Sequence, residues 1–244
     1  MYIQRYEFAD KKPKILIFTG AGISAESGIS TFRDSNGLWE DHKISEVCNI
    51  DTWQKNFDLV HKFYNKRRTQ LKEVEPNKAH KIIAEISNKF DTFVFTQNVD
   101  DLLERAGCKE VHHLHGELTK MRCMGCNNIY EIGYNEYLGE ACEKCGSTNI
   151  KPYIVFFGES APEYSMLNRG IDYMRGSDTT IIVSGTMGNV IDINSKIANK
   201  NSYKILNNLE HSMFLNEDNF DKILYEKATI AWPKIKQIIE ERHG

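Results

Sequence analysis

The feature that most limits how this chain can fold is an apolar strand that breaks directly into a glycine-rich turn. Residues 14–19 read KILIFT, a short β-branched run typical of a buried parallel strand. Gly20, Gly22 and Ala25 follow with the spacing of the GxGxxG/A dinucleotide fingerprint. In that fingerprint the glycines permit a tight turn and close approach of a pyrophosphate, and the third position lets a helix pack on the strand. We therefore expect a strand, a turn and a helix whose first N–H groups face a phosphate.

A long polar and aromatic loop follows this turn. A simple dinucleotide-binding unit reaches a second strand that ends in an acidic residue about 20 positions further on. The sequence after Gly28 shows no such strand pattern and instead reads TFRD at 31–34 and GLW at 37–39. Loops this long are usually functional, so we expect ligand contacts here. A surface loop with Phe32 and Trp39 packed into the core is the alternative.

Four cysteines form the most specific chemical pattern in the sequence. Two C-x2-C pairs are separated by fifteen residues, at Cys123, Cys126, Cys142 and Cys145. Four converging thiolates are the ligand set of a closed, structural Zn²⁺ site, so we expect one Zn²⁺ per chain in a small zinc ribbon whose spacer forms a hairpin. A redox pair or an iron–sulfur cluster is the alternative. Cys48 and Cys108 read as ordinary buried thiols.

Length and charge exclude several classes of protein. The 244 residues suffice for one large domain that carries a smaller one. The 31 basic and 34 acidic residues give a net charge of -3, which offers no electrostatic footprint for nucleic acid. Residues 1–13 predict a polar lead-in helix rather than a signal peptide, and no run approaches the roughly 18 apolar residues of a membrane span. We expect a soluble, cytoplasmic protein, with a monomer favoured.

A cluster of amide and carboxylate side chains follows the apolar strand expected over residues 92–96. Its members are Gln97, Asn98, Asp100 and Asp101. Ligands bind at the carboxyl ends of strands in open α/β sheets. Capping of the next helix is the alternative, but a cap needs only one such residue.

Three histidines, at positions 112, 113 and 115, follow this region. Imidazole is suited to proton transfer near neutral pH. Gly116 leaves room for a substrate beside His115. We therefore expect His115 to be functional and the other two to be structural.

The remaining pattern alternates helices and strands. Helices are expected over residues 41–75, from 80 to 90, after Asp101, and at the end of the chain, where Ile235, Ile238 and Ile239 form a docking face. Further strands are expected at residues 151–157, 179–183 and 203–207, the second of them followed by another small-residue turn.

The chain carries a series of motifs, which in chain order are GAGIS, TQNVD, HGEL, the two cysteine pairs, FFGE and GTM. This series resembles that of the sirtuins, the NAD-dependent protein lysine deacylases. The resemblance implies NAD as co-substrate, His115 as the general base, and Asn98 and Asp100 as groups that position the ribose, nicotinamide and water. It implies NAD contacts at Gly20, Ala21, Gly22, Ala25, Glu26, Phe32, Arg33, Trp39, Gln97, Asn98, Val99, Asp100, Gly185, Thr186, Met187, Asn208, Leu209, Glu210 and Ala228. It implies peptide or acyl contacts at Phe157, Gly158, Glu159 and Val190.

The resemblance also implies the architecture. The fold class is α/β, a Rossmann-like doubly wound parallel sheet with a smaller zinc-ribbon plus helical domain, within one catalytic domain of residues 1–244. Residues 14–40, 77–115 and 152–244 would form the large domain. A helical insertion at 41–76 and the zinc ribbon at 116–151 would form the small one.

Two stretches bear on how this chain would differ from other sirtuins. The family usually reads GTS and then V-x-P-A, where this chain has Met187 and, further on, Val190-Ile191-Asp192-Ile193. The lost hydroxyl predicts weaker NAD affinity or a shifted peptide register.

Tyr64 and Arg67 match the Tyr-x-x-Arg pair of the subgroup that accepts succinyl- and malonyl-lysine. A guanidinium can bind an acyl carboxylate through two hydrogen bonds. A solvated arginine beside a half-buried tyrosine is the alternative.

We therefore expect an NAD-dependent lysine deacylase that removes acetyl and also succinyl or malonyl groups from proteins or peptides, with neither membrane nor nucleic acid as a partner. An NAD glycohydrolase or ADP-ribosyltransferase on the same fold is the main alternative. A dehydrogenase is disfavoured by the missing ribose acid, and a zinc-ribbon binding module by the near-neutral charge and the His115 motif.

Overall fold

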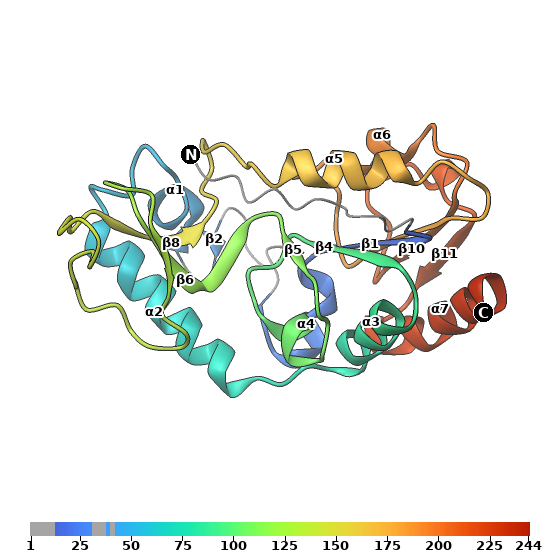
Figure 1. Cartoon of the computed structure of the whole chain (residues 1–244), viewed down its shortest axis with the longest axis horizontal. Helices are drawn as coiled ribbons and strands as arrows, with labels where there is room; N and C mark the ends of the chain where they lie inside the picture. Colours follow the sequence, from blue (N-terminus) through green and yellow to red (C-terminus); the bar gives the residue numbers. More distant parts are fainter. Residues whose placement is uncertain (1–12, 31–37, 40–41) are drawn as a thin grey trace.

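The computed structural model describes residues 13–30, 38–39 and 42–244, without the side chains of Leu38 and Trp39 (Figure 1). The expected lead-in helix and the contacts expected of Phe32 and Arg33 lie outside these residues. Among the helices that are described, none combines the length and the apolar character needed to cross a membrane.

A six-stranded parallel sheet forms the centre of the molecule, which confirms the expected fold class. The strand order is β11-β10-β9-β1-β4-β5, so the chain winds outward in both directions from β1. β1 pairs in register with β4 on one side and β9 on the other, and all five residues of β1 are buried. The bounds are β1 Ile15–Thr19, β4 Thr92–Thr96, β5 His112–His113, β9 Thr180–Ser184, β10 Tyr203–Asn208 and β11 Lys222–Tyr225.

Helices cover both faces of this sheet (Figure 1). Alternate residues of β1 point to opposite faces because side chains alternate along a strand. Ile15 and Ile17 join the apolar cluster beneath α3 (Lys78–Lys89) and α7 (Ala228–His243). Leu16 and Phe18 join the cluster beneath α5 (Tyr164–Tyr173) and α6 (Ile193–Ile197). Burial on both faces explains why β1 reads as a continuous apolar run rather than an alternating one.

A three-stranded antiparallel sheet and α2 (Phe57–Glu73) lie at one end of the molecule, beside the six-stranded sheet (Figure 1). The strand order is β7-β6-β8, with β6 Gly116–Cys123, β7 Ile129–Glu131 and β8 Ile150–Ile154. The fully buried Arg68 of α2 donates a hydrogen bond to the carbonyl of Leu118 in β6. This bond ties the helix to the sheet.

The hairpin expected within the cysteine spacer is wrong. The spacer supplies only β7, which pairs back with β6, and residues 132–149 contain no strand. The first cysteine pair is itself the turn, since the N–H of Asn127 donates to the carbonyl of Cys123 and the N–H of Cys123 to Asn128. Asn127 has a positive φ of 59°, which asparagine tolerates better than most residues.

The helix expected after the glycine turn is also wrong. Two single-turn 3₁₀ helices, η1 (Ala21–Ile23) and η2 (Ala25–Ser27), stand in its place. Ser24, between them, is fully buried and points into a polar network, and Gly28 ends the second turn with a left-handed φ of 94°. The chain therefore leaves the strand as a compact loop.

Other helix predictions hold with changed bounds. The helical region expected over 41–75 divides into β3 (His42–Lys43), which pairs with β2 (Leu38–Trp39), then α1 (Ile44–Val47), a series of turns, and α2. The short α4 (Leu102–Arg105) ends near Gly107, as expected. In α7 the side chains of Ile235 and Ile239 are fully buried and Ile238 is partly buried, which confirms its docking face. β11 was not predicted.

Candidate active site

A cleft of about 1410 Å³ runs along the carboxyl ends of the central strands and reaches the three-stranded sheet. Its position agrees with the rule that ligands bind where the strand order of an open α/β sheet reverses. The lining residues include most of the predicted contacts: Gly20, Ala21, Gly22, Ala25, Glu26, Arg67, Gln97, Asn98, Val99, Asp100, His115, Phe157, Gly158, Glu159, Gly185, Thr186, Met187, Val190, Asn208, Leu209, Glu210 and Ala228. Tyr64 does not line it, and Phe32, Arg33 and the side chain of Trp39 are not described.

Two glycine turns pack against each other at the floor of the cleft. A Cβ on Gly22 would lie 2.7 Å from the Cα of Gly185, and one on Gly20 would lie 2.7 Å from the Gly185 carbonyl oxygen. The N–H of Gly22 donates to that same oxygen at 2.9 Å. These glycines are therefore required for backbone packing between β1 and β9, whatever they also do for a ligand.

Hydrogen bonds from two side chains join the polar turns. Gln97 Nε2 donates to Thr186 Oγ1 at 2.9 Å, and Asn208 Nδ2 donates to the Thr186 carbonyl at 2.8 Å. The turns after β4, β9 and β10 are thus held as one surface.

Ser24, which the sequence analysis did not select, links three buried polar side chains. Its hydroxyl donates to Asp100 Oδ2 at 3.0 Å and accepts from Asn98 Nδ2 at 3.0 Å. His80 Nε2 lies 3.2 Å from the same hydroxyl. The N–H of Asn77 donates to His80 Nδ1, so the proton of His80 is on Nε2 and is donated to Ser24. Burial lowers the pKa of His80 to about 4, which keeps it neutral.

Asp100 ends this network at the wall of the cleft. Its two oxygens accept from the Ser24 hydroxyl and from the N–H of Leu102 at 3.2 Å. Burial raises its pKa, although both hydrogen bonds act in the opposite direction. Asp100 and Asn98 therefore present fixed polar groups beside the predicted position of the ribose.

His115 is held in one tautomer. Its Nδ1 lies 3.0 Å from the Gln97 carbonyl, which can only accept, so Nδ1 carries the proton. Its Nε2 therefore holds the lone pair and accepts a hydrogen bond from the hydroxyl of Tyr164 at 2.7 Å. Burial lowers the pKa of His115, and the bond to Gln97 offsets part of that effect. A neutral imidazole whose Nε2 carries a lone pair is suited to act as a base.

The neighbouring histidines have other surroundings. His112 is buried and stacks on Phe95, with ring centroids 4.9 Å apart. His113 Nε2 lies 2.6 Å from Glu104 Oε1, and its Nδ1 lies 2.9 Å from the Asn98 carbonyl. Neither lines the cleft.

At the far end of the cleft, Arg67 and Cys48 line the wall. Arg67 is only 5% exposed, and its guanidinium carbon lies 5.8 Å from the centre of the Phe63 ring. Tyr64 is fully buried, and its ring stacks on that of Phe156 with the ring centroids 5.8 Å apart. Cys48 is buried, as expected, but it also forms part of the site.

The segment after β8 is fixed by a buried ion pair. Lys151 Nζ lies 2.8 Å from Glu159 Oε2, and the exposed fractions of the two side chains are 2% and 12%. The same carboxylate oxygen accepts the N–H of Phe156 at 2.7 Å. This arrangement presents Phe157 and Gly158 to the cleft.

At the opposite end, Glu26 has a structural role. Its carboxylate accepts the N–H of Thr229 at 3.0 Å and the Thr229 hydroxyl at 2.8 Å. Thr229 lies in the first turn of α7, where a carboxylate is favourable for the helix dipole. Glu226 and Lys227 line this end of the cleft and were not predicted.

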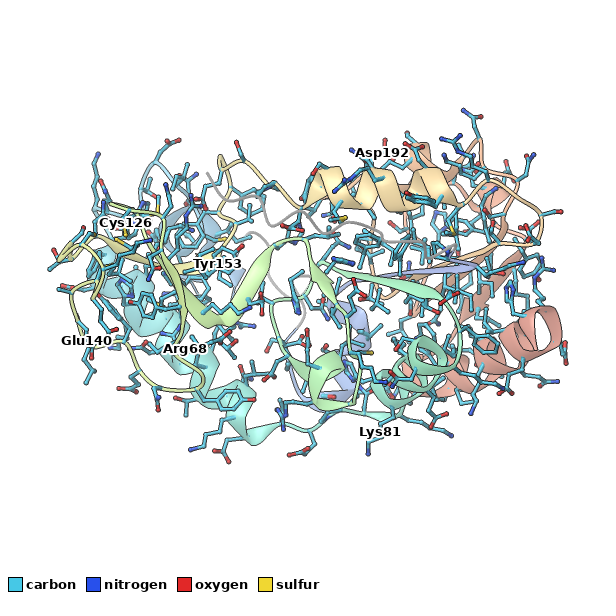
Figure 2. The ribbon with its side chains drawn as sticks, viewed as in Figure 1. Arg68, Lys81, Cys126, Glu140, Tyr153 and Asp192 are labelled. Atoms are coloured by element: carbon cyan, nitrogen blue, oxygen red, sulfur yellow. The ribbon has the colours of Figure 1, made fainter. Side chains whose placement is uncertain are left out.

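The four predicted cysteines come together at the end of the molecule where Figure 2 labels Cys126. Their sulfur atoms all lie within 4.8 Å of one another, with 3.6 Å between Cys123 and Cys145 and 3.7 Å between Cys126 and Cys142. A tetrahedral Zn²⁺ with Zn–S bonds of about 2.3 Å needs sulfurs about 3.8 Å apart. The donor set therefore fits Zn²⁺ with all four positions filled by protein.

Asp192, one of the positions at which this sequence departs from the V-x-P-A pattern, caps a helix. Its carboxylate accepts the N–H of Ser195 at 2.9 Å at the start of α6 (Figure 2). It does not line the cleft.

Comparisons with known proteins agree with this geometry. The family model described as "Sir2 family" matches residues 20–192. Proteins named NAD-dependent protein deacylase from Helicobacter hepaticus and Campylobacter jejuni are 43% and 44% identical to this chain. The alignments cover 94% and 93% of this chain, and 98% and 95% of those proteins. A crystal structure of a Sir2 homolog–NAD complex has a TM-score of 0.81 and 33% identity, over 94% of this chain and 90% of that one.

Proposed function

Because the chain belongs to the Sir2 family and is an NAD-dependent protein deacylase, we propose that its cleft removes acetyl groups and also succinyl or malonyl groups from lysine side chains. The position of Arg67 supports the proposed removal of the acidic succinyl and malonyl groups. Arg67 lines the same cleft as His115, and the residue is only 5% exposed. A carboxylate at the end of an acyl chain would bind this cation through charge-assisted hydrogen bonds.

We propose that NAD lies along the carboxyl ends of the strands, with its phosphates on the turn at Gly20 and Gly22. Asn208, Leu209, Glu210 and Ala228 would contact the adenosine. Asn98 and Asp100 would hold the nicotinamide ribose and water, because the Ser24 and His80 network fixes their side chains.

In the proposed reaction, the acyl oxygen of the modified lysine attacks the nicotinamide-ribose carbon and nicotinamide leaves. His115 then takes a proton from a ribose hydroxyl, which attacks the alkylimidate. Hydrolysis gives the free lysine and O-acyl-ADP-ribose. The tautomer of His115 supports this role, since Nδ1 carries the proton, Nε2 holds the lone pair and the residue lines the cleft.

The substrate peptide is proposed to lie against Phe157, Gly158 and Val190, whose side chains or backbone form the rim. Phe157 and Val190 are each 45% exposed, so both can contact an extended peptide. One structural Zn²⁺ per chain would hold the small domain. The domain boundaries, a monomeric state and a cytoplasmic location remain predictions from the sequence.

Arg67→Met tests the choice of acyl group. Acetyl- and succinyl-lysine forms of one peptide are incubated with and without NAD, and the products are followed by mass spectrometry. A hydrogen-bonded charge pair contributes about 1.5–3 kcal/mol, so desuccinylation should fall about 10- to 150-fold. Deacetylation should change little, because an acetyl group offers no carboxylate.

Lys66→Met is the matched control, because Lys66 is exposed on the same helix and lies outside the cleft. Equal loss of both activities in the Arg67 variant would refute the acidic-acyl proposal. NAD consumption with both peptides left intact would instead favour a glycohydrolase or ADP-ribosyltransferase.

A further inference from the structure

The atom of His115 that must accept a proton is already engaged by a second side chain. The hydroxyl of Tyr164 lies 2.7 Å from His115 Nε2 and donates to it, since Nδ1 carries the only imidazole proton. Both residues line the cleft. A hydroxyl of the bound ribose would therefore meet the phenol oxygen where it approaches the base.

Both partners of this hydrogen bond are held in place. The His115 ring is fixed at Nδ1 by the Gln97 carbonyl. Tyr164 is the first residue of α5, and its N–H donates to the Ala161 carbonyl at 3.1 Å. Its ring packs on the apolar cluster between α5 and the sheet, so moving it away from His115 would uncover apolar surface.

The phenol is also in a suitable chemical state. A tyrosine hydroxyl can accept one hydrogen bond while it donates another. Burial raises the pKa of Tyr164, so the group stays neutral and keeps its proton at neutral pH. The residue is half-buried and lines the cleft, so a ligand in the cleft can contact it.

We propose that Tyr164 is a catalytic residue that relays the proton from the ribose hydroxyl to His115. The ribose O–H bond breaks and its proton passes to the phenol oxygen. The phenol O–H bond breaks at the same time, and that proton passes to His115 Nε2. The ribose oxygen attacks the alkylimidate, the imidazole becomes imidazolium, and Tyr164 ends with its hydroxyl intact.

This inference rests on the proposed deacylase reaction, with His115 as the base. It assigns Tyr164 to the second half of that reaction only. Loss of nicotinamide precedes the proton transfer, so the first half should proceed without the phenol.

Tyr164→Phe separates these two halves, because it removes the hydroxyl and keeps the ring that packs on the core. The acyl-peptide turnover rate should fall about 10- to 100-fold, at the lower end of what a positioned proton-transfer group contributes. Exchange of labelled nicotinamide into NAD, measured with the same acyl peptide, should be retained or increased. Retained exchange also shows that the variant is folded and binds both substrates.

Tyr173→Phe is the matched control. Tyr173 lies at the other end of α5, is 47% exposed and does not line the cleft. It should leave both turnover and exchange unchanged.

Three results would overturn the relay. Unchanged or faster deacylation in the Tyr164 variant would show that the phenol is displaced by the substrate. Parallel loss of turnover and exchange would show a structural role. A wild-type protein that removes no acyl group would refute the proposed function as well, which distinguishes that failure from a failure of the relay alone.

Discussion

Lys151→Met should strongly destabilise the protein, because it leaves a charge without its partner in the interior. The Lys151 ammonium lies 2.8 Å from Glu159 Oε2 and 2.5 Å from the Ile154 carbonyl. It also lies 3.8 Å from the centre of the Phe156 ring. Its side chain is 2% exposed, so water cannot replace these contacts.

The magnitude follows from this burial. Removing one partner of a buried ion pair costs about 3–5 kcal/mol, since the other charge stays buried and uncompensated. A chain of this size loses about 2–4 °C in Tm for each kcal/mol. We therefore expect Tm to fall by about 6–20 °C.

Thermal and urea unfolding of the zinc-loaded protein would measure this effect. Lys236→Met is the matched control, because Lys236 pairs with Glu85 at 2.6 Å on the surface, with exposed fractions of 35% and 56%. Surface pairs contribute about 0–1 kcal/mol. The double variant Lys151→Met/Glu159→Gln should recover most of the loss, because glutamine can still accept the Phe156 N–H without a buried charge.

A loss of less than about 1 kcal/mol in the Lys151 variant, the range expected of an exposed pair, would contradict this expectation. A double variant that is no more stable than the single one would also contradict it. Loss of the pair should in addition weaken peptide binding, because Glu159 fixes the segment that carries Phe157 and Gly158.

Two further predictions concern metal and pH. Removing the metal with a chelator should release one Zn²⁺ per chain, lower Tm and abolish deacylation, because the four thiolates would repel one another or oxidise without it. Metal analysis that finds no zinc, or full activity after removal, would contradict the zinc site. For His113, burial lowers the pKa, but the hydrogen bond and charge of Glu104 outweigh it and leave the pKa raised. A raised folded-state pKa stabilises the protein below the unfolded value of about 6.5 and loses this effect as pH rises through the folded-state value. Glu104→Gln should therefore be destabilised more at about pH 5.5 than at about pH 8.5 in urea unfolding, and equal losses at both would refute the pairing.

The features predicted from the sequence were those encoded over short stretches. The cysteine pairs, the polar cluster after β4 and the buried β1 each lie within a few residues, so their spacing alone indicates what they form. The confirmed fold class follows from the order of such stretches.

The features that were missed depend on contacts between distant residues. Ser24 meets His80 across 56 positions, and His115 meets Tyr164 across 49. His80 reads as one residue of an amphipathic helix, and Tyr164 as an aromatic residue at a helix start. The only local sign is the Asn77-x-x-His80 spacing of a capping box, which indicates where the helix begins but not that His80 faces Ser24.

The glycine turn was misjudged for a related reason. Spacing predicted a regular helix after Gly22, and the structure has two 3₁₀ turns. The inward position of Ser24 depends on partners from α3 and from the turn after β4, which local helix propensity does not include.

The packing of Gly22 on Gly185 also bears on the order in which this protein assembles. The two residues are 163 positions apart, and Gly185 in turn donates its N–H to the carbonyl of Asn207. Contacts of such separation form late, because the loop between them must close first. During synthesis the N-terminal turn would emerge from the ribosome long before β9 and β10 could support it. A chain released before Asn207 would carry the complete glycine motif and still lack the surface on which that motif takes its shape.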